Sequence, residues 1–593
     1  MCGIVGYFGD KKASDVILDG LSKLEYRGYD SAGIAVISDG EIKSRKHKGK
    51  LSVLVESLKK EDIFGHVGIG HTRWATHGAP SDINSHPHFN NDKSIAVVHN
   101  GIIENYQELK KELEEKGAKF VSSTDTEVVA HLISLYYTGS LKDAVYKATK
   151  RLEGSYALGV ICKDNPEELV AVRKSSPLIL GLGENEYYIA SDIPAILKYT
   201  REVVYLEDHD LVVINRSGVS IYDEQMNKVK REVNHVEWDI QAATKGGYDF
   251  FMDKEIHEQK EAVKNTIEKS LLNLREINID FSDIDKIYIV ACGTAYNAGT
   301  IGKYYFQEYL NKPVYTDIAS EFRYNKQFID QHTLVILVSQ SGETADTLAV
   351  LRKVKEHGCK VLAVTNVVGS TISREADNVF YTFAGPEIAV ASTKAYTTQI
   401  VSLYLIARYF STTKEEFEDV LKEAVKICPL IDEVLEKEKD IKEIARKFIN
   451  AKSIFYLGRS IDHALANEGA LKLKEISYIH AESFAAGELK HGTIALIENM
   501  TPVVAIMTQK DLYDKMLSNI QEVKARGAYI VAVTNDNEKI KFADDTIQIP
   551  EFCQMLTPIL AVIPLQILAY YTSYLKGYDV DKPRNLAKSV TVE

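Results

Sequence analysis

Hydrophobic and polar positions follow two different patterns along the chain, and the pattern changes near the middle. In the second half, continuous apolar runs at residues 286–291, 333–339 and 361–366 alternate with segments of helical periodicity. Strands that are apolar at every position are typical of a parallel sheet covered by helices on both faces. The second half is therefore predicted to be doubly wound α/β structure.

The same series of strands occurs a second time. Residues 453–460, 501–507 and 530–535 have the same character, order and spacing as the first series. Two copies of one arrangement predict two similar domains, which we place at residues 247–428 and 429–593.

The first half has short strands interrupted by glycine, such as residues 32–37 and 154–161, and few long helical segments. The clearest helices are expected at 104–116 and 126–137. This pattern predicts a mixed α/β domain with substantial antiparallel sheet.

The change of pattern also sets the domain boundaries. A chain of 593 residues is too long for one hydrophobic core. We expect the first domain to cover residues 1–238. The polar run at 239–246, followed by a second glycine, is typical of a linker.

One apolar segment near the C-terminus has two interpretations. Residues 555–575 carry no charge and are long enough to span a bilayer. Pro558, Pro564 and Gln566 interrupt the segment, however, and several hydroxyl side chains accompany them. These residues favour a helix buried inside a domain, so we expect no membrane-spanning segment.

Composition and charge exclude several classes of protein. The chain is 45% hydrophobic and 26% charged, which is ordinary for a globular protein. Its formal net charge of −13 argues against nucleic acid as a partner. The six cysteines show neither zinc-site nor disulfide spacing. We therefore expect no metal and a reducing, cytoplasmic setting.

The first candidate for chemistry is Cys2. If Met1 is removed, this residue carries a thiol nucleophile and an α-amine whose pKa is roughly 7.7–8.0 in solution. The alternative is an accidental cysteine at a frayed end. Residues 4–9 form a short apolar strand with glycines, which favours an ordered terminus that holds the nucleophile in place.

The second candidate is the turn Ser-Gln-Ser-Gly-Glu-Thr at 339–344, between a strand and a helix. Ligands of parallel sheets bind at the carboxyl ends of strands, and helix N-termini favour phosphate. Ordinary helix capping is the alternative, but it needs fewer polar positions. Neither repeat has a dinucleotide or Walker motif, so we expect no nucleotide cofactor. The second repeat has Thr-Gln-Lys-Asp at 508–511 instead, which predicts one phosphate site per chain.

The second repeat offers acid–base groups. Glu468, Lys472 and Glu475 share one helix face by their spacing, and His491 lies further on. Such groups can move a proton on a sugar. The pattern alone favours the simpler interpretation, which is a solvated charged face.

Together these segments resemble a known family. The first half resembles class II glutamine amidotransferases at residues 2–7, 26–33, 71–78, 99–106 and 123–127. The two repeats resemble tandem SIS (sugar isomerase) domains. From residue 2 to 593, the chain is similar to the glutamine–fructose-6-phosphate aminotransferase (isomerizing) family. The resemblance implies an N-terminal-nucleophile αββα sandwich followed by two doubly wound SIS domains.

The resemblance also implies roles in glutamine hydrolysis. Cys2 would attack the side-chain amide, and Asn100 and Gly101 would form the oxyanion hole. Arg73 and Asp125 would bind the carboxylate and the amine of glutamine. The remaining substrate contacts implied in this segment are Trp74, near the ammonia route, Thr76 and His77.

For the sugar, the resemblance implies that Glu475 moves a proton between C1 and C2. His491, from the neighbouring subunit of a homodimer, would open the ring. Lys588 would form a Schiff base with the open sugar, and Lys472 would support the site. The other contacts to fructose 6-phosphate would be Thr294, Ser339, Gln340, Ser341, Thr344, Val390 and Ser392. The product would be glucosamine 6-phosphate, without a cofactor.

The sequence departs from the family pattern at two places. Ala295 stands where a serine is usual, which removes one sugar contact, and Thr493-Ile494 replaces Pro-Leu after His491-Gly492. Two other functions fit the sequence less well. A phosphoribosyl-pyrophosphate amidotransferase would carry an acidic phosphoribosyl motif that this chain lacks. A SIS-based regulator would usually carry a helix-turn-helix module, and both Cys2 and the net charge oppose it.

Overall fold

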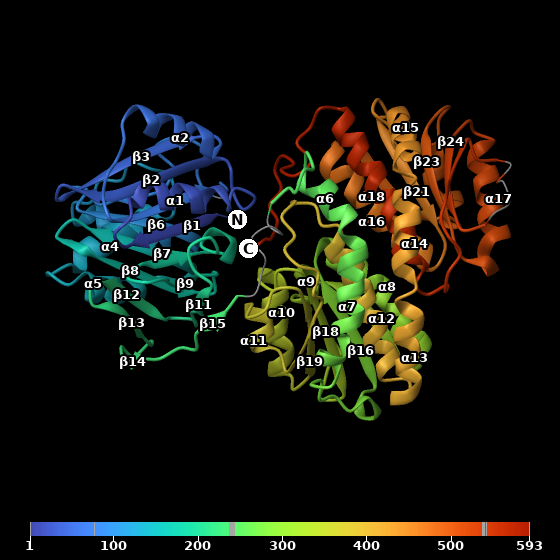
Figure 1. The fold of residues 1–593 in the computed structure, drawn as a ribbon, viewed down its shortest axis with the longest axis horizontal. Helices are drawn as coiled ribbons and strands as arrows, with labels where there is room; N and C mark the ends of the chain where they lie inside the picture. Colours follow the sequence, from blue (N-terminus) through green and yellow to red (C-terminus); the bar gives the residue numbers. More distant parts are fainter. Residues whose placement is uncertain (1, 76, 237–243, 537–539, 541, 592–593) are drawn as a thin grey trace. The chain divides into compact units, whose positions relative to one another are not determined.

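The computed structural model describes residues 2–591 except 76, 237–243, 537–539 and 541. The chain divides into two compact units, Met1–Gln241 with Ala587–Glu593, and Ala242–Leu586. Figure 1 colours both units along the sequence. Most of the predicted linker at 239–246 lies outside the described residues.

Within the described residues, the first unit contains two antiparallel sheets. The larger sheet has the strand order β15 (Asn234–His235), β11 (Glu202–Tyr205), β9 (Ile179–Leu182), β10 (Tyr187–Ala190), β1 (Gly3–Phe8), β4 (Val67–Arg73), β2 (Ser31–Ser38) and β3 (Glu41–Lys48). The smaller sheet has the order β14 (Lys228–Val229), β13 (Gly218–Tyr222), β12 (Leu211–Asn215), β8 (Asn165–Lys174), β7 (Gly154–Cys162), β6 (Ile95–Ile103) and β5 (His88–Phe89).

The two sheets pack face to face and carry helices on their outer faces. Because successive side chains of a strand point to opposite faces, Ile4 lies in the core between the sheets and Val5 lies under the outer helices. Helices α1 (Ala13–Ser22) and α2 (Leu51–Lys60) cover the larger sheet. The smaller sheet is covered by α3 (Tyr106–Glu115), α4 (Glu127–Tyr136) and α5 (Leu141–Thr149). The predicted αββα sandwich is confirmed.

The second unit contains two parallel sheets within the described residues. The first has the order β17 (Val314–Ile318), β16 (Lys286–Ala291), β18 (Thr333–Ser339), β19 (Lys360–Thr365) and β20 (Asn378–Tyr381). The second has the order β22 (His480–Ala485), β21 (Ser453–Gly458), β23 (Pro502–Met507), β24 (Tyr529–Thr534) and β25 (Asp545–Gln548). Both sheets therefore follow the order 2-1-3-4-5, which confirms the duplication.

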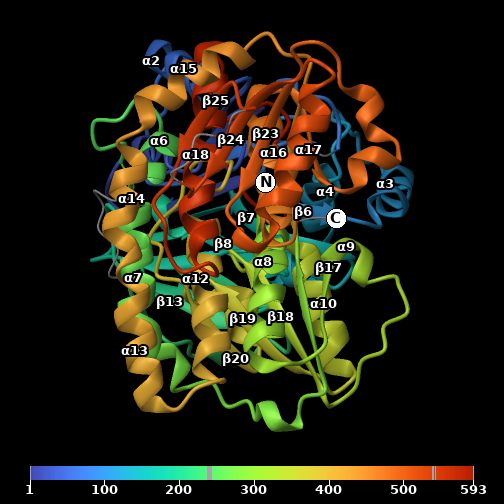
Figure 2. The ribbon, with the colours of Figure 1, turned by 90° about the vertical axis from the view of Figure 1, so that its right-hand side faces the viewer.

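Helices cover both faces of each parallel sheet, as Figure 2 shows from the side. Ile289 of β16 faces a core that extends across both repeats, and the next residue, Val290, faces the opposite layer. The shared core contains α6 (Phe251–His257), α7 (Gln259–Leu274), α8 (Gly293–Leu310), α12 (Lys394–Tyr409), α13 (Lys414–Ala424), α14 (Ile427–Leu435), α15 (Glu438–Phe448), α16 (Ile461–Ser477) and α18 (Thr557–Leu575). The outer layers contain α9 (Ala319–Phe322), α10 (Ala345–Glu356), α11 (Thr371–Glu375) and α17 (Tyr513–Lys524).

Helix α18 corresponds to the apolar segment at 555–575, for which a membrane span and a buried helix were the two interpretations. It is long and apolar enough to cross a membrane by composition, but 83% of that window is buried inside the protein. Its polar side chain Gln566 is buried and accepts a hydrogen bond from Gln259 Nε2 at 2.8 Å. The expectation of a buried core helix is confirmed.

Candidate active sites

Cys2 is held at the start of β1 by the end of β4. The two strands pair with Gly3 opposite Thr72, which brings Cys2 to Trp74. The backbone N–H of Trp74 donates to Cys2 Sγ at 3.3 Å, and Sγ lies 3.5 Å from the Trp74 carbonyl oxygen. Burial raises the pKa of the Cys2 thiol, while the Trp74 N–H and the Arg73 guanidinium act in the opposite direction. The ordered terminus expected from residues 4–9 is observed, since these residues lie in and just after β1.

Asn100 and Gly101 lie side by side on β6. Asn100 Nδ2 donates to the carbonyl oxygen of Cys2 at 2.9 Å, so this amide faces the nucleophilic residue. Gly101 has φ +132°, and a Cβ there would lie 2.0 Å from the carbonyl oxygen of Ser155. Only glycine fits this position, because both the backbone angle and the contact exclude a side chain.

The guanidinium group of Arg73 offers a hydrogen-bond donor near the Cys2 thiol. One terminal nitrogen, Nη2, donates to the carbonyl oxygens of His77 and Gly78, the latter at 3.0 Å. The other, Nη1, is buried and has no hydrogen-bond partner within the described residues. Asp125 is also buried and accepts from the backbone N–H of Ile103 at 2.8 Å. A guanidinium nitrogen and a carboxylate are therefore available for the two charged groups of an amino acid.

The remaining glutamine-site predictions lie in the loop after β4. The Trp74 ring packs edge-on against Tyr29, with centroids 5.7 Å apart. His77 packs against Tyr106 in the same manner at 5.6 Å. Thr76 lies outside the described residues.

In the second unit, the hydroxyl-rich turn at 339–344 connects β18 to α10. Thr344 occupies the N-cap position of α10, but its side chain makes no capping hydrogen bond there within the described residues. Its hydroxyl instead lies 3.3 Å from Ser339 Oγ, which also accepts from the Gly342 N–H at 3.1 Å. Simple capping therefore does not account for Thr344. Ser341 Oγ accepts from the backbone N–H of Glu343 at 3.2 Å, and Gln340 completes the turn.

In the corresponding turn of the second repeat, a carboxylate of the chain accepts the hydrogen bonds that Thr508 donates. The side chain of Asp462 accepts from Thr508 N at 2.8 Å and from Thr508 Oγ1 at 2.5 Å. Burial raises the pKa of Asp462 to about 6, and the hydrogen bonds from Thr508 act against that rise. An internal acid therefore engages the Thr508 donors of this turn, and one phosphate site per chain stays a prediction.

Helix α16 joins the two repeats through Glu468. Thr294 Oγ1 donates to this carboxylate at 3.1 Å and Asn297 Nδ2 donates at 2.8 Å, both from α8 of the first repeat. Glu468 is fully buried, and burial raises its pKa to about 7. Helical spacing predicted the helix face of Glu468 correctly, but it did not indicate Asn297 or the bridge between the repeats.

Lys472 lies between two carboxylates on the same helix. Its Nζ is 2.5 Å from Glu475 Oε2 and 3.6 Å from Glu468 Oε1. The Lys472 side chain is 1% exposed and that of Glu475 is 21% exposed. Burial alone would lower the pKa of Lys472, but the two carboxylates raise it. The solvated-face interpretation is therefore wrong for this helix face.

The other predicted sugar contacts lie in loops and in the C-terminal segment. The Val390 N–H donates to the carbonyl oxygen of Asp581 at 3.0 Å, and Ser392 lies half-buried two residues later. His491 is exposed at the end of the 3-10 turn η4 (Glu488–His491). Lys588 is half-buried in the C-terminal segment that groups with the first unit. The ion pairs described for Lys472 are those with Glu468 and Glu475.

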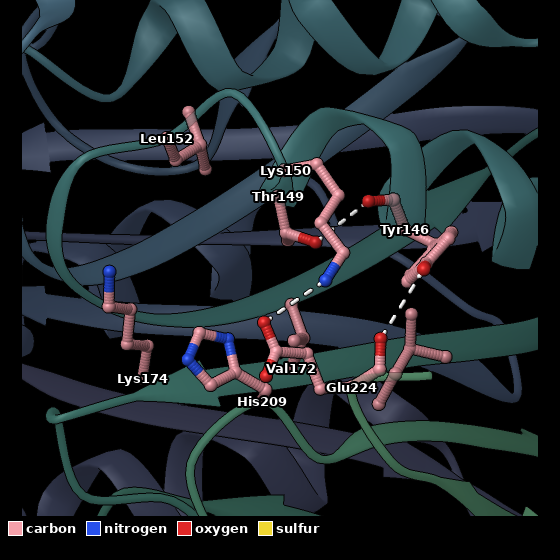
Figure 3. A pocket seen from close by; sticks show the side chains of 9 residues that line it. Tyr146, Thr149, Lys150, Leu152, Val172, Lys174, His209 and Glu224 are labelled. Carbon is pink, nitrogen blue, oxygen red and sulfur yellow. Dashed lines mark hydrogen bonds and ion pairs between the residues drawn. The ribbon is translucent and has the colours of Figure 1, made fainter. Parts of the chain in front are cut away.

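A pocket in the first unit contains none of the predicted site residues. Figure 3 shows two contacts between its lining residues, the Lys150–Glu224 ion pair at 3.1 Å and the hydrogen bond from Tyr146 OH to the Glu224 carbonyl oxygen at 3.3 Å. Its apolar wall contains Leu152, Val172 and Leu211. Three of its polar lining residues, Lys150, Tyr146 and Glu224, therefore already pair with one another.

One side-chain group combines metal-ligating residue types. Asp253, His257 and Glu438 have ligand atoms within 4.8 Å of one another. His257 Nδ1 lies 3.3 Å from Asp253 Oδ1, and Nε2 lies 3.5 Å from Glu438 Oε2. The carboxylates raise the pKa of His257 to about 10. Both ring nitrogens face carboxylates, so the arrangement fits an imidazolium ion pair better than a metal ligand.

Comparisons with known proteins match both units. A SIS domain family model matches residues 280–409 and 447–576, and a glutamine amidotransferase domain model matches residues 71–198. A glutamine–fructose-6-phosphate aminotransferase [isomerizing] from Clostridium perfringens is 56% identical over 610 residues, and the match covers 100% of both chains. The enzyme of that name from Thermus thermophilus is 49% identical over 606 residues, again with full coverage.

A solved structure supports the second unit. The C-terminal domain of glucosamine-fructose-6-phosphate aminotransferase from Francisella tularensis is 40% identical, with a TM-score of 0.54. The match covers 57% of this chain and 99% of that one. With relatives above 30% identity along the whole length, the chain belongs to the glutamine–fructose-6-phosphate aminotransferase (isomerizing) family.

Proposed function

We propose that this chain hydrolyses glutamine to glutamate and ammonia, transfers the ammonia to fructose 6-phosphate and isomerises the product to glucosamine 6-phosphate. This reaction supplies amino sugar for UDP-N-acetylglucosamine synthesis. The observation that carries the proposal is the full-length similarity to enzymes of that name, at 56% identity, in a chain that retains Cys2.

In the first unit, Cys2 Sγ attacks the amide carbon of glutamine. The amide nitrogen leaves as ammonia, and water then hydrolyses the γ-glutamyl thioester to glutamate. Asn100 Nδ2, which lies 2.9 Å from the Cys2 carbonyl oxygen, and the Gly101 N–H stabilise the oxyanion. After removal of Met1, the α-amine of Cys2 takes the thiol proton.

Arg73 and Asp125 select the amino acid. The buried Nη1 of Arg73 lacks a partner within the described residues, which supports its role as the donor to the substrate carboxylate. The buried Asp125 carboxylate binds the α-ammonium group. Trp74, His77 and Thr76 belong to the substrate-binding loop.

In the second unit, the phosphate of fructose 6-phosphate binds the turn at 339–344, and Thr294, Val390 and Ser392 contact the sugar. His491 of the partner subunit opens the ring. Lys588 then attacks the C2 carbonyl and forms a Schiff base with loss of water. Ammonia displaces the lysine, and Glu475 moves a proton from C1 to C2, which gives the 2-amino aldose. Lys472 Nζ, 2.5 Å from Glu475 Oε2, orients this side chain.

We propose a homodimer formed through the SIS domains and a cytoplasmic location. The exposed position of His491 supports the dimer, because a residue that serves a neighbouring subunit must be accessible. The predicted boundaries at 238, 246 and 428 remain predictions, as do the absence of nucleic-acid and membrane partners and the independence from a cofactor.

The test measures glutamate and glucosamine 6-phosphate in one sample of purified chain. With glutamine and fructose 6-phosphate, we expect equal amounts of the two products. Replacing the hexose phosphate with phosphoribosyl pyrophosphate should give no aminated sugar. Formation of phosphoribosylamine, or the absence of glutamate release under all conditions, would contradict the proposal in favour of the purine-type enzyme or the sensor.

A further inference from the structure

His71 is a buried histidine next to the proposed oxyanion hole. It lies on β4, two residues before Arg73, and is fully buried. Its Nε2 is 2.9 Å from the carbonyl oxygen of His99 and 3.0 Å from Asn100 Oδ1. None of the roles assigned above to the glutamine site uses this side chain.

The His99 carbonyl fixes the tautomer of His71. A backbone carbonyl oxygen only accepts hydrogen bonds, so the ring nitrogen 2.9 Å away must carry the hydrogen. The tautomer in turn fixes the amide of Asn100, because an N–H at 3.0 Å must face the amide oxygen rather than its NH₂ group. The Cys2 carbonyl oxygen, 2.9 Å from Asn100 Nδ2, requires the same orientation independently.

The ring is also held neutral and in place. Nδ1 of His71 is buried and has no hydrogen-bond partner within the described part of the chain. Burial lowers the pKa of His71 to about 3, and the nearby Arg73 charge acts in the same direction. The His86 ring stacks on His71 with centroids 4.0 Å apart and planes at 12°. His86 Nδ1 accepts from the backbone N–H of His99 at 3.3 Å, so the pair is tied to β6.

We infer that His71 is a positioning residue that fixes the side-chain amide of Asn100 with its NH₂ group toward the oxyanion. This inference rests on the proposed glutaminase function. Without the Nε2–H donor, the 2.9 Å hydrogen bond to the Cys2 carbonyl oxygen is the one remaining contact among those described that holds this orientation, so the amide turns more readily and presents its oxygen to the developing negative charge. A correctly oriented donor in an oxyanion hole contributes about 10²–10³ in kcat.

The first test replaces the donor. We expect His71→Leu to lower kcat for glutamine hydrolysis by about ten- to hundredfold. KM for glutamine should change less than about threefold, since Arg73 and Asp125 remain. His71→Gln, which returns an N–H donor, should recover part of the rate. The matched control is His131→Gln, which replaces another buried histidine of the same unit that contacts Phe120 and Glu127.

A double-mutant cycle distinguishes loss of the Asn100 amide orientation from a general structural defect of the site. In an Asn100→Ala background, His71→Leu should change kcat by less than about twofold, because the amide it orients is absent. Losses that multiply in the double variant would overturn the inference. If Asn100→Ala alone leaves kcat unchanged, the proposed oxyanion role of Asn100 fails instead, so the two failures are distinguishable.

A binding measurement distinguishes a positioning role of His71 from partial misfolding of the variant. Glutamate γ-semialdehyde adds the Cys2 thiol to its aldehyde carbon, and the resulting hemithioacetal oxygen occupies the oxyanion position. We expect His71→Leu to weaken inhibition by this aldehyde at least tenfold and inhibition by glutamate less than threefold. Equal weakening of both would show a general defect and contradict a positioning role.

Discussion

At the scale of single residues, the proposed glutamine chemistry depends on side-chain atoms that can still bond to a substrate. Cys2 Sγ contacts only the backbone of Trp74 among the hydrogen bonds described, and Nη1 of Arg73 has no partner within the described residues. The carbonyl oxygens of His77 and Gly78 hold the other terminal nitrogen of Arg73. Loss of such a group should remove one chemical step and leave the fold intact.

Cys2→Ala should abolish glutamine use, because no other thiol lies beside the α-amine. Synthesis from added ammonia should persist at a reduced rate, since the second unit is unchanged. The measurement is glutamate release with glutamine, compared with glucosamine 6-phosphate formation from ammonium salts. Cys553→Ala, at an exposed cysteine of the second unit, is the control and should keep both activities. Full glutamine-dependent turnover by Cys2→Ala would falsify the nucleophile assignment.

At the scale of secondary-structure elements, helix α16 shows how burial changes the meaning of a charged face. Glu468, Lys472 and Glu475 repeat at helical spacing, as on many solvated helices. Here α8 covers the face, and Thr294 and Asn297 satisfy the Glu468 carboxylate. A buried cation between two carboxylates is costly to remove, because both acids then lose their counter-charge.

Lys472→Met should reduce synthesis of glucosamine 6-phosphate by more than about a hundredfold and leave glutamine hydrolysis within about twofold of the native rate. Breaking one partner of a buried ion pair also destabilises the second unit by about 3 kcal/mol. Both activities and the unfolding midpoint would be measured together. Lys474→Met, on the exposed side of the same helix, should change neither quantity. Equal losses in the two variants would contradict a specific role for Lys472.

His257 links α6 to α15 and should make the stability of the second unit depend on pH. Its folded-state pKa, raised to about 10 by Asp253 and Glu438, exceeds the unfolded value of about 6.5. The stabilisation is therefore fully present below pH about 6.5 and is lost as pH rises toward 10. The difference in melting temperature between the native chain and His257→Gln should shrink across that window. A difference that stays constant from pH 6 to pH 10 would contradict the ion pair.

At the scale of the whole molecule, the proposed reaction needs two activities to share one intermediate. Ammonia made beside Cys2 must be used in the second unit before it escapes. The proposed glutamine site lies in an antiparallel sandwich, and the turn at 339–344 and Lys472 belong to a pair of parallel-sheet repeats. Variants that uncouple them are therefore more informative than variants that stop either one.

Trp74→Ala should uncouple the two reactions if its ring gates the ammonia route. The backbone N–H and carbonyl of Trp74, which contact Cys2 Sγ, survive the substitution, so glutamine hydrolysis should continue. Glucosamine 6-phosphate should then fall to less than half of the glutamate released. Phe64→Ala, at a large exposed ring of the same unit, is the control. A ratio that stays at one to one in Trp74→Ala would exclude the gate.

Lys588→Arg should lose synthesis and keep glutamine hydrolysis, because a guanidinium stays protonated and cannot form a Schiff base. Borohydride added with fructose 6-phosphate should trap a stable adduct on Lys588 in the native chain. Lys582→Arg, at a lysine shortly before Lys588 in the chain, provides the control. A Lys588→Arg variant that synthesises glucosamine 6-phosphate at the native rate would show that the tail lysine is not catalytic.

The sequence alone was sufficient for the architecture. Apolar runs repeated in the same order predicted two parallel sheets. Strands covered by helices on both faces do not face solvent, so they need no alternating polar residues. Two expected helices, at 104–116 and 126–137, correspond to α3 (Tyr106–Glu115) and α4 (Glu127–Tyr136). Motif resemblance also placed Cys2, Asn100 and Arg73 in one site, and the structure brings them together.

Only the tertiary structure decided which polar groups are buried and which way they point. Helical spacing is the same for a solvated and a buried face, so the sequence could not show that α8 contacts Glu468 or that Lys472 is buried. Likewise, the spacing of His71 and Asn100 carries no sign of their contact, since β4 and β6 belong to different sheets. The orientation of one amide depends on hydrogen bonds between distant segments, and those exist only after the sheets have packed.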